Sequence, residues 1–257
     1  MASTEAKPAA PVTQVVAPTN RLKAVLSNQQ FLLLIVWLAM VIGFSLISPI
    51  FFSVDVAANI LLDWAPLVLI ALGQLVVVIS AGIDLSVGAT VGFSGVIGAF
   101  AMKSLNASGQ ATVTTLVAGV LVCMLVGAFI GTINALLINY ARLVPFIATL
   151  VTLGAASGLS LVLTKGAPIM GGPSDAIFLV TPWIGPFSKP VVVIIGIVVV
   201  LWLFMHKARF GRYTFAIGSN SFAARAAGIN VRRHIAKVYV LSGVLAGLAG
   251  FFFYLRL

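Results

Sequence analysis

The sequence predicts an all-α, polytopic transmembrane helix bundle with about seven spans. Of its 257 residues, 61% are hydrophobic and only 8% are charged, whereas a soluble domain carries about 25% charged residues. The apolar residues form runs long enough to cross a bilayer, and most polar residues lie between these runs. Because lipid offers the backbone no hydrogen-bond partners, we expect these runs to be helices.

The amino-terminal part predicts a tail followed by one complete span. Residues 1–28 form the cytoplasmic tail and pre-helix segment, which we expect to be disordered because it lacks a helical apolar period. Phe31–Ile50 is about 20 residues long, enough for a first span and too long for the core of a signal peptide. Residues 51–65 then form an outer loop with Asp55 and Asp63. The transmembrane domain as a whole is predicted to cover residues 29–257.

The next stretch predicts two short spans that are separated by a break. At 1.5 Å per residue, Pro66–Ser80 reaches only about 22 Å, less than the thickness of the hydrocarbon core. The polar tetrapeptide Ala81–Asp84 interrupts the apolar sequence, which resumes at Leu85–Met102. Short, glycine-interrupted segments of this kind often line a translocation path.

The rest of the chain predicts four further spans. They are Ala111–Ile138, Pro145–Thr164, Pro190–Met205 and Val238–Leu257. Residues 165–189 form a Pro- and Gly-rich outer segment in which Trp183 and Phe187 are placed as interface anchors. Because the chain stops directly after an apolar run, we expect the natural protein to continue past Leu257.

Glycine pairs spaced by four residues occur on four of the predicted helices. They are Gly88/Gly92, Gly127/Gly131, Gly154/Gly158 and Gly243/Gly247. Small residues at this spacing let two helix backbones approach closely in lipid. The four pairs therefore predict a compact bundle rather than a set of separate anchors.

The net charge of +10 is explained by membrane orientation and needs no nucleic-acid partner. Residues 207–237 hold seven of the fifteen Lys and Arg residues and no acid. Arg142 lies in another loop that the order of the spans places on the same side of the membrane. Cytoplasmic loops carry such an excess of basic residues. The expected localisation is therefore a multi-pass membrane protein with a cytoplasmic amino terminus.

Five polar residues within or beside the spans are candidates for a substrate path. They are Gln74, Asp84, Ser86, Asn134 and Thr149. A carboxylate at membrane depth indicates function because its burial is costly, yet Asp84 could equally accept hydrogen bonds from the start of the following helix. The other four could line a wet path for a hydroxyl-rich solute or form interhelical hydrogen bonds.

The sequence contains none of the arrangements that catalysis would need. We find no phosphate-binding glycine loop, no paired carboxylates and no Ser-His-Asp or Cys-His set. His206 and His234 lack neighbouring ligands for a metal, and Cys123 lies within an apolar run. We therefore expect no enzyme activity, no cofactor and no metal, and any ATPase that powers transport must be a separate polypeptide.

The basic segment 207–237 contains a short helix with its own start and stop signals. Asn220 and Ser221 can cap its beginning, Phe222–Ala227 can form about two turns, and Gly228 can end it in a left-handed conformation. The residues expected to contact an ATPase are Asn220, Ser221, Phe222, Ala223, Ala224, Arg225 and Gly228.

Three stretches together resemble the permease subunits of ribose/xylose-type ABC sugar importers. They are the AGIDLSVG sequence at 81–88, the VPFIATL sequence at 144–150, and residues 214–243 with their AAR-x-x-GIN-V core. The resemblance covers roughly residues 30–257. It implies a permease that works with a second permease chain, ABC ATPase subunits and a periplasmic sugar-binding protein in the bacterial inner membrane.

The resemblance also implies roles for particular residues and a substrate class. Residues 220–228 correspond to the coupling helix of the family, in which Phe222 stands where a Glu is common and favours an apolar anchor. The expected substrate is a monosaccharide, a pentose or similar sugar. Two alternatives remain open: an ABC permease for a branched-chain amino acid or nucleoside, and an ion-coupled secondary transporter that uses Asp84.

Overall fold

The computed structural model describes residues 29–173 and 176–256, which belong to two compact units, 1–53 and 54–257. The first unit contains α2 (Gln29–Ile47), an apolar helix of 19 residues. Its position confirms the first predicted span, with its carboxyl end three residues earlier. The tail predicted for residues 1–28 lies outside the described residues.

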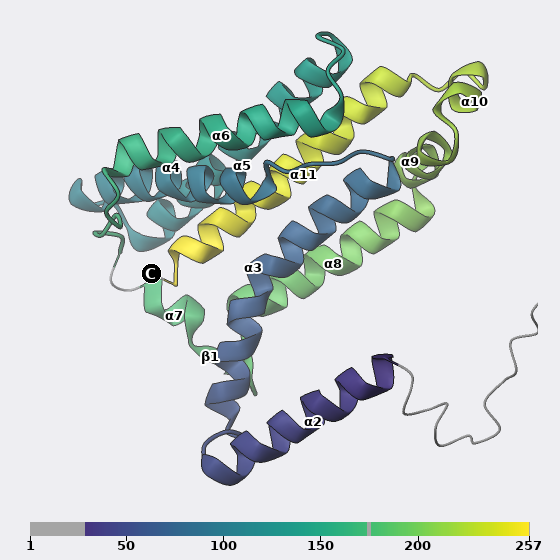
Figure 1. The fold of residues 1–257 in the computed structure, drawn as a ribbon. Coiled ribbons are helices and arrows are strands. Elements are labelled where there is room, and N and C mark those ends of the chain that lie inside the picture. Colours follow the sequence, from purple (N-terminus) through teal and green to yellow (C-terminus); the bar gives the residue numbers. More distant parts are fainter. Residues whose placement is uncertain (1–28, 174–175, 257) are drawn as a thin grey trace, which may run out of the picture. The chain divides into compact units, whose positions relative to one another are not determined.

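The second unit contains the other long helices (Figure 1). They are α3 (Val54–Ile79), α4 (Val87–Ala107), α5 (Thr112–Asn139), α6 (Pro145–Thr164), α8 (Lys189–Lys207) and α11 (Val231–Tyr254). With α2, the described residues form seven helices that are long and apolar enough to cross a membrane. The prediction of about seven spans in an all-α bundle is therefore confirmed.

Short elements connect the long helices at both ends of the second unit. Between α6 and α8 lie α7 (Ile177–Val180) and a small antiparallel hairpin of β1 (Pro182–Ile184) and β2 (Phe187–Ser188). Between α8 and α11 lie α9 (Arg209–Ser219) and α10 (Ser221–Ala226). Because α6 and α8 run in opposite directions, α10 and the hairpin belong to opposite ends of the bundle (Figure 1).

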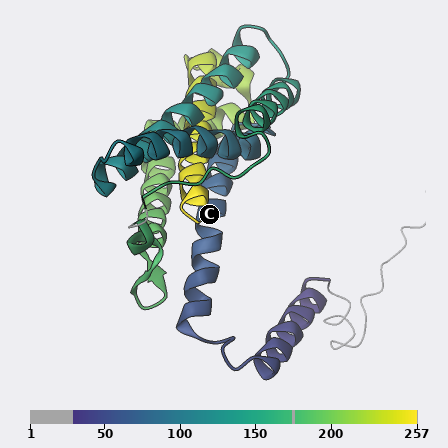
Figure 2. The same ribbon diagram turned by 90° about the vertical axis from the view of Figure 1, so that its left-hand side faces the viewer.

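Helix α11 is the core of the second unit (Figures 1 and 2). Eleven of its residues from Val238 to Phe251 are buried, and α11 packs against α3, α4 and α5. Where α11 meets α5, Gly243 and Gly247 lie directly against the backbone of Gly127 and Cys123, and Gly131 lies against Tyr239. The absence of Cβ atoms lets the two main chains touch, as expected for this spacing.

The structure corrects the predicted outer loop 51–65 and the short span after it. Helix α3 already begins at Val54, so Asp55 and Asp63 lie within the helix, and its 26 residues span about 39 Å. Pro66, taken as a helix start, is inside α3, where neighbouring groups in a packed bundle can compensate for the missing N–H. Asp63 forms an ion pair with Arg256, a partner that is remote in sequence. The two spans around the break are consequently of full length.

The start of the last span also differs from the prediction. Helix α11 begins at Val231 rather than Val238, because the Asn230 side chain caps it by accepting a hydrogen bond from the N–H of Arg233 at 3.0 Å. The segment 207–237 is therefore largely helical. It contains the end of α8, all of α9 and α10, and the first two turns of α11.

Candidate functional site

The break between α3 and α4 is the irregular segment 80–86, and hydrogen bonds hold it at both ends. Ser80, the first residue after α3, donates from its hydroxyl to the carbonyl of Val77, and Ala81 has a left-handed φ of +59°. Asp84 accepts two hydrogen bonds on one carboxylate oxygen, from the N–H of Ser86 at 2.9 Å and from its hydroxyl at 2.6 Å. The carboxylate therefore orders the residues just before α4, but Ser86 and not Asp84 is the cap residue of α4, and it makes no side-chain capping bond.

A buried chain of hydrogen bonds continues from this segment into the neighbouring helices. Asn134 of α5 donates to the Ser86 hydroxyl at 2.8 Å and accepts from the Thr152 hydroxyl of α6 at 2.6 Å. Thr149 of α6 accepts from the N–H of Leu85 at 3.1 Å. The break, α5 and α6 are thus joined by side chains whose polar groups satisfy one another.

Helix α11 closes the same network from the other side. The Tyr239 hydroxyl donates to the carbonyl of Ile83 at 3.1 Å, and the Ser242 hydroxyl reaches the second carboxylate oxygen of Asp84 at 3.5 Å. Burial raises the pKa of the Asp84 carboxyl above its ordinary value, and the hydrogen bonds from Ser86 and Ser242 act in the opposite direction.

The structure brings together four of the five residues predicted for a substrate path. Asp84, Ser86, Asn134 and Thr149 are all buried in the network, whereas Gln74 of α3 has a buried side-chain oxygen without a hydrogen-bond partner. Their role in a substrate path stays a prediction. Sequence reasoning missed Tyr239 and Ser242, although their spacing of three places them on one face of α11.

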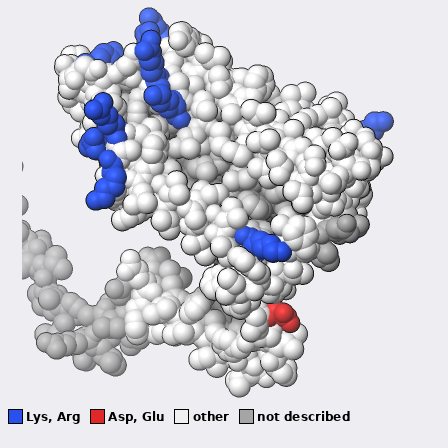
Figure 3. Space-filling view, turned by 180° about the vertical axis from the view of Figure 1, so that it is seen from behind, with Lys and Arg blue, Asp and Glu red and all other residues white. Residues whose placement is uncertain are grey.

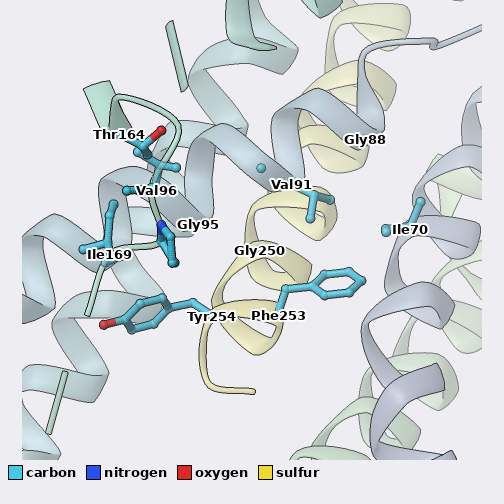
Figure 4. A pocket seen from close by; sticks show the side chains of 14 residues that line it. Ile70, Gly88, Val91, Gly95, Val96, Thr164, Ile169, Gly250, Phe253 and Tyr254 are labelled. Atoms are coloured by element: carbon cyan, nitrogen blue, oxygen red, sulfur yellow. The ribbon is translucent and has the colours of Figure 1, made fainter. Parts of the chain in front are cut away.

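Two adjoining cavities lie along the glycine-rich face of α4. One of about 490 Å³ is enclosed by α4, the end of α11 and the segment after α6, with Val91, Phe253 and Tyr254 around it (Figure 4). The other, of about 580 Å³, is bounded by Gly88 and Gly92 of α4 and by the hydroxyl-bearing residues Ser157, Ser160 and Thr164 of α6. These cavities therefore lie beside, and not within, the Asp84 network.

The short helix predicted in the basic segment is present as α10. The Asn220 side chain accepts from the N–H groups of Phe222 at 3.0 Å and Ala223 at 2.9 Å, which caps the start. Gly228 ends it with a φ of +84°, and the following N–H of Ile229 donates to the carbonyl of Ala224. Local sequence signals therefore fix both ends of α10.

Helix α10 is exposed, and α9 fastens it to the bundle. The Phe222 side chain is 80% exposed, whereas Ala224 is buried. In α9, Gly218 packs directly against the carbonyl of Ile79, the last residue of α3. The Thr214 hydroxyl of α9 also contacts Nε2 of His234 in α11 at 2.8 Å. Through α9, the region of α10 is thus in contact with α11 and with the end of α3 just before the break.

Comparison with known proteins identifies the relatives of this chain. A ribose import permease protein (RbsC) from Haemophilus influenzae is 34% identical over 88% of this chain and 68% of that protein. A D-allose transport system permease protein (AlsC) of Escherichia coli K12 is 34% identical over 80% and 62% of the two chains. A galactose/methyl galactoside import permease protein (MglC) of the same strain is 32% identical over 86% and 68%.

No solved structure matches the chain significantly. The pattern of the family described as the permease component of branched-chain amino acid transport systems matches residues 56–257, which include all of α4 to α11. Together with the three sugar permeases, this match confirms the resemblance inferred from the motifs at 81–88, 144–150 and 214–243. The chain belongs to this family of transport-system permease components.

Proposed function

We propose that the chain is the membrane permease of an ATP-driven importer for a monosaccharide, a pentose or similar sugar. The three relatives named for ribose, allose and galactose support a sugar rather than the amino acid of the family description. The natural setting is the bacterial inner membrane with the amino terminus in the cytoplasm. The partners are ABC ATPase subunits, a periplasmic sugar-binding protein and a second permease chain.

The observation that carries this proposal is the exposed, doubly capped helix α10. An aromatic side chain that is 80% exposed on a rigid six-residue helix is suited to enter a groove on a partner. The two caps hold α10 rigid, so that a push on Phe222 moves the helix as a unit. Its contacts through α9 with α3 and α11 support a role in transmitting motion from ATPase subunits to the bundle.

The proposal is tested by replacing this anchor and measuring association with the ATPase subunit. The full chain is co-expressed with a candidate ATPase subunit from the same genome, and the amount that co-purifies is measured. Burial of a Phe side chain contributes about 1.5–3 kcal/mol, so Phe222→Ala should weaken association at least about tenfold. Phe215→Ala is the matched control because Phe215 is an exposed Phe of the neighbouring helix α9. Equal association of wild type and Phe222→Ala would contradict docking at α10.

The alternative of an ion-coupled transporter that uses Asp84 has less support. The hydrogen bonds from Ser86 and the contact with Ser242 account for the Asp84 carboxylate without any transported ion. Uptake of labelled ribose into right-side-out vesicles, loaded with or without ATP, distinguishes the two mechanisms. For the ATP-driven importer, we expect uptake to need ATP on the α10 side and to continue when an uncoupler is added at constant ATP. Uptake by an ion-coupled carrier would stop when the uncoupler is added.

A further inference from the structure

A further cavity of about 320 Å³ lies at the α10 end of the bundle. Unlike the two cavities along α4, it is bordered by charged side chains. Three arginines border it, each from a different part of the fold: Arg142 from the turn between α5 and α6, Arg225 from α10, and Arg232 from the first turn of α11. The rest of its wall consists of the break residues 80–82, of Asn139, Pro145 and Tyr239, and of the apolar side chains of Ile138, Val231 and Ile235. We refer to it as the arginine pocket.

The arginine pocket holds positive charge that nothing in the described residues balances. No carboxylate lines it, and the guanidinium groups of Arg142, Arg225 and Arg232 make no ion pair or side-chain hydrogen bond within residues 29–173 and 176–256. Figure 3 shows Lys and Arg gathered at the upper left of this view and others farther to the right, and the acid that is visible lies away from the upper-left group. Membrane orientation explains basic residues at this end, but it does not require three of them around one cavity.

The backbone around the arginine pocket is held in an unusual conformation. Arg142 has a φ of +56° and Ala81 a φ of +59°, and both residues line the pocket. Both residues lie just after a helix, where backbone hydrogen bonds hold the left-handed turn: the N–H of Gly82 donates to the carbonyl of Val77 at 3.0 Å, and the N–H of Leu143 donates to the carbonyl of Leu137 at 3.2 Å. The Asn139 side chain also donates to the carbonyl of Arg232 at 3.0 Å and ties the end of α5 to the start of α11.

We propose that the arginine pocket binds a phosphomonoester group. Guanidinium groups bind phosphate oxygens through paired, charge-assisted hydrogen bonds. A phosphate dianion balances the charge of three guanidinium groups better than a carboxylate does, because a carboxylate carries one negative charge. The volume accommodates a phosphate with a small organic substituent but no folded partner. A soluble phosphate monoester and the headgroup of phosphatidic acid both carry this chemistry, and basic pockets beside membrane helices are known to bind lipid headgroups.

A ligand in the arginine pocket would connect the parts that α10 has to move. It would bridge α10, the start of α11, the α5–α6 turn and the break that precedes Asp84. A bound phosphate therefore holds α10 against the bundle and restrains its motion. This consequence rests on the proposed function, whereas the binding itself does not.

Binding is tested on the purified full chain in nanodiscs of neutral phosphatidylcholine at low ionic strength. The probe is glycerol 3-phosphate, with unesterified glycerol as the negative control, and the heat of binding is measured by calorimetry. Arg142→Gln and Arg232→Gln should each weaken binding about tenfold, because each removes charge-assisted hydrogen bonds to the phosphate. Arg233→Gln is the matched control: it changes the same net charge beside Arg232 without touching the pocket, and it should alter binding less than twofold.

A second arm identifies the source of the phosphate group. Phosphatidic acid is added to the nanodiscs at increasing fractions before glycerol 3-phosphate is titrated. Competition supports a lipid headgroup as the natural ligand, and unchanged binding supports a soluble ester. The proposal is overturned if neither probe binds, or if Arg233→Gln weakens binding as much as Arg232→Gln. It is also overturned if Arg142→Gln and Arg232→Gln leave glycerol 3-phosphate binding intact but weaken ATPase association, since a carboxylate of the partner then fills the pocket.

Discussion

Four glycine pairs share one spacing in the sequence, yet they stand in two opposite environments. On α5 and α11, Gly127, Gly131, Gly243 and Gly247 lie so close that an added Cβ would overlap the facing backbone. On α4 and α6, a Cβ added at Gly88, Gly92, Gly154 or Gly158 would meet nothing within 4 Å. The same spacing thus accompanies a backbone-to-backbone helix contact in one place and open helix faces in another.

This contrast indicates which parts of the second unit are fixed and which can move. The α5–α11 contact is a backbone-to-backbone seam in which no side chain can rearrange to absorb a displacement. The open faces of α4 border the two larger cavities, where a neighbour or a solute can enter without distorting either helix. Small residues therefore serve close packing in one place and leave space in the other.

The largest loss of stability is expected where the backbones of α5 and α11 touch. Gly127→Ala places a methyl group against the carbonyl of Gly243, and the helices must separate to accept it. Overpacking typically costs about 1–3 kcal/mol, and we expect the upper end here because only backbone atoms face the added methyl group. We expect a large fall in the thermal midpoint of the detergent-solubilised protein and a low yield of monodisperse material on gel filtration.

The matched control is the same substitution on an open face. Gly154→Ala adds an identical methyl group to α6, where it meets no atom within 4 Å. Its thermal midpoint should stay near that of the wild type. Equal losses for Gly127→Ala and Gly154→Ala would mean that the contrast between the two regions does not exist in the membrane protein.

A loss of thermal stability of intermediate size is expected at Asn134. Its hydrogen bonds join α5 to α6, a helix whose Gly154 and Gly158 make no close contact. Asn134→Leu removes the hydrogen bonds that Asn134 makes with the hydroxyls of Ser86 and Thr152, at a cost of about 1–3 kcal/mol, while Ser86 keeps its bond to Asp84 and Thr152 its bond to the carbonyl of Thr149. The loss of thermal stability should be smaller than that of Gly127→Ala. A double-mutant cycle with Thr152→Val measures the coupling, and strictly additive losses would contradict a shared hydrogen bond.

The number of spans and the ends of α10 could be predicted because their signals are local. Apolar length alone indicates a span, and the capping residues Asn220 and Gly228 lie next to the helix that they bound. The start of α3 could not be predicted in the same way. Its Asp63 is neutralised by Arg256, nearly two hundred residues later, and a partner of that kind leaves no local pattern.

For the candidate sites, too, the sequence predicts local features but not contacts between distant residues. The polar residues Asp84, Ser86, Asn134 and Thr149 could be selected by their type, but their mutual hydrogen bonds depend on the packing of α4, α5 and α6. The arginine pocket was invisible in the sequence, because Arg142, Arg225 and Arg232 belong to three elements. Likewise, the spacing of the glycines could not reveal which pairs meet another helix.

The smallest effect on stability is expected at the open face of α4. Gly92→Ala meets no neighbouring atom and replaces a poor helix former with a good one, so the change in unfolding free energy should be a gain of up to about 1 kcal/mol. Thermal midpoints of the two proteins, measured in the same detergent, check this expectation. A clear loss would mean that the face is covered in the folded protein.

The same position separates stability from transport when the substituent is made larger. Gly92→Leu fills part of the space that Gly92 shares with Ser157 and Ser160, and it should leave the thermal midpoint nearly unchanged because no backbone has to move. If the sugar passes along this face, uptake by the assembled importer should fall while association with its ATPase subunit stays intact. Unchanged uptake would assign the space to packing against another chain or lipid, and the route of the sugar would then lie elsewhere in the bundle.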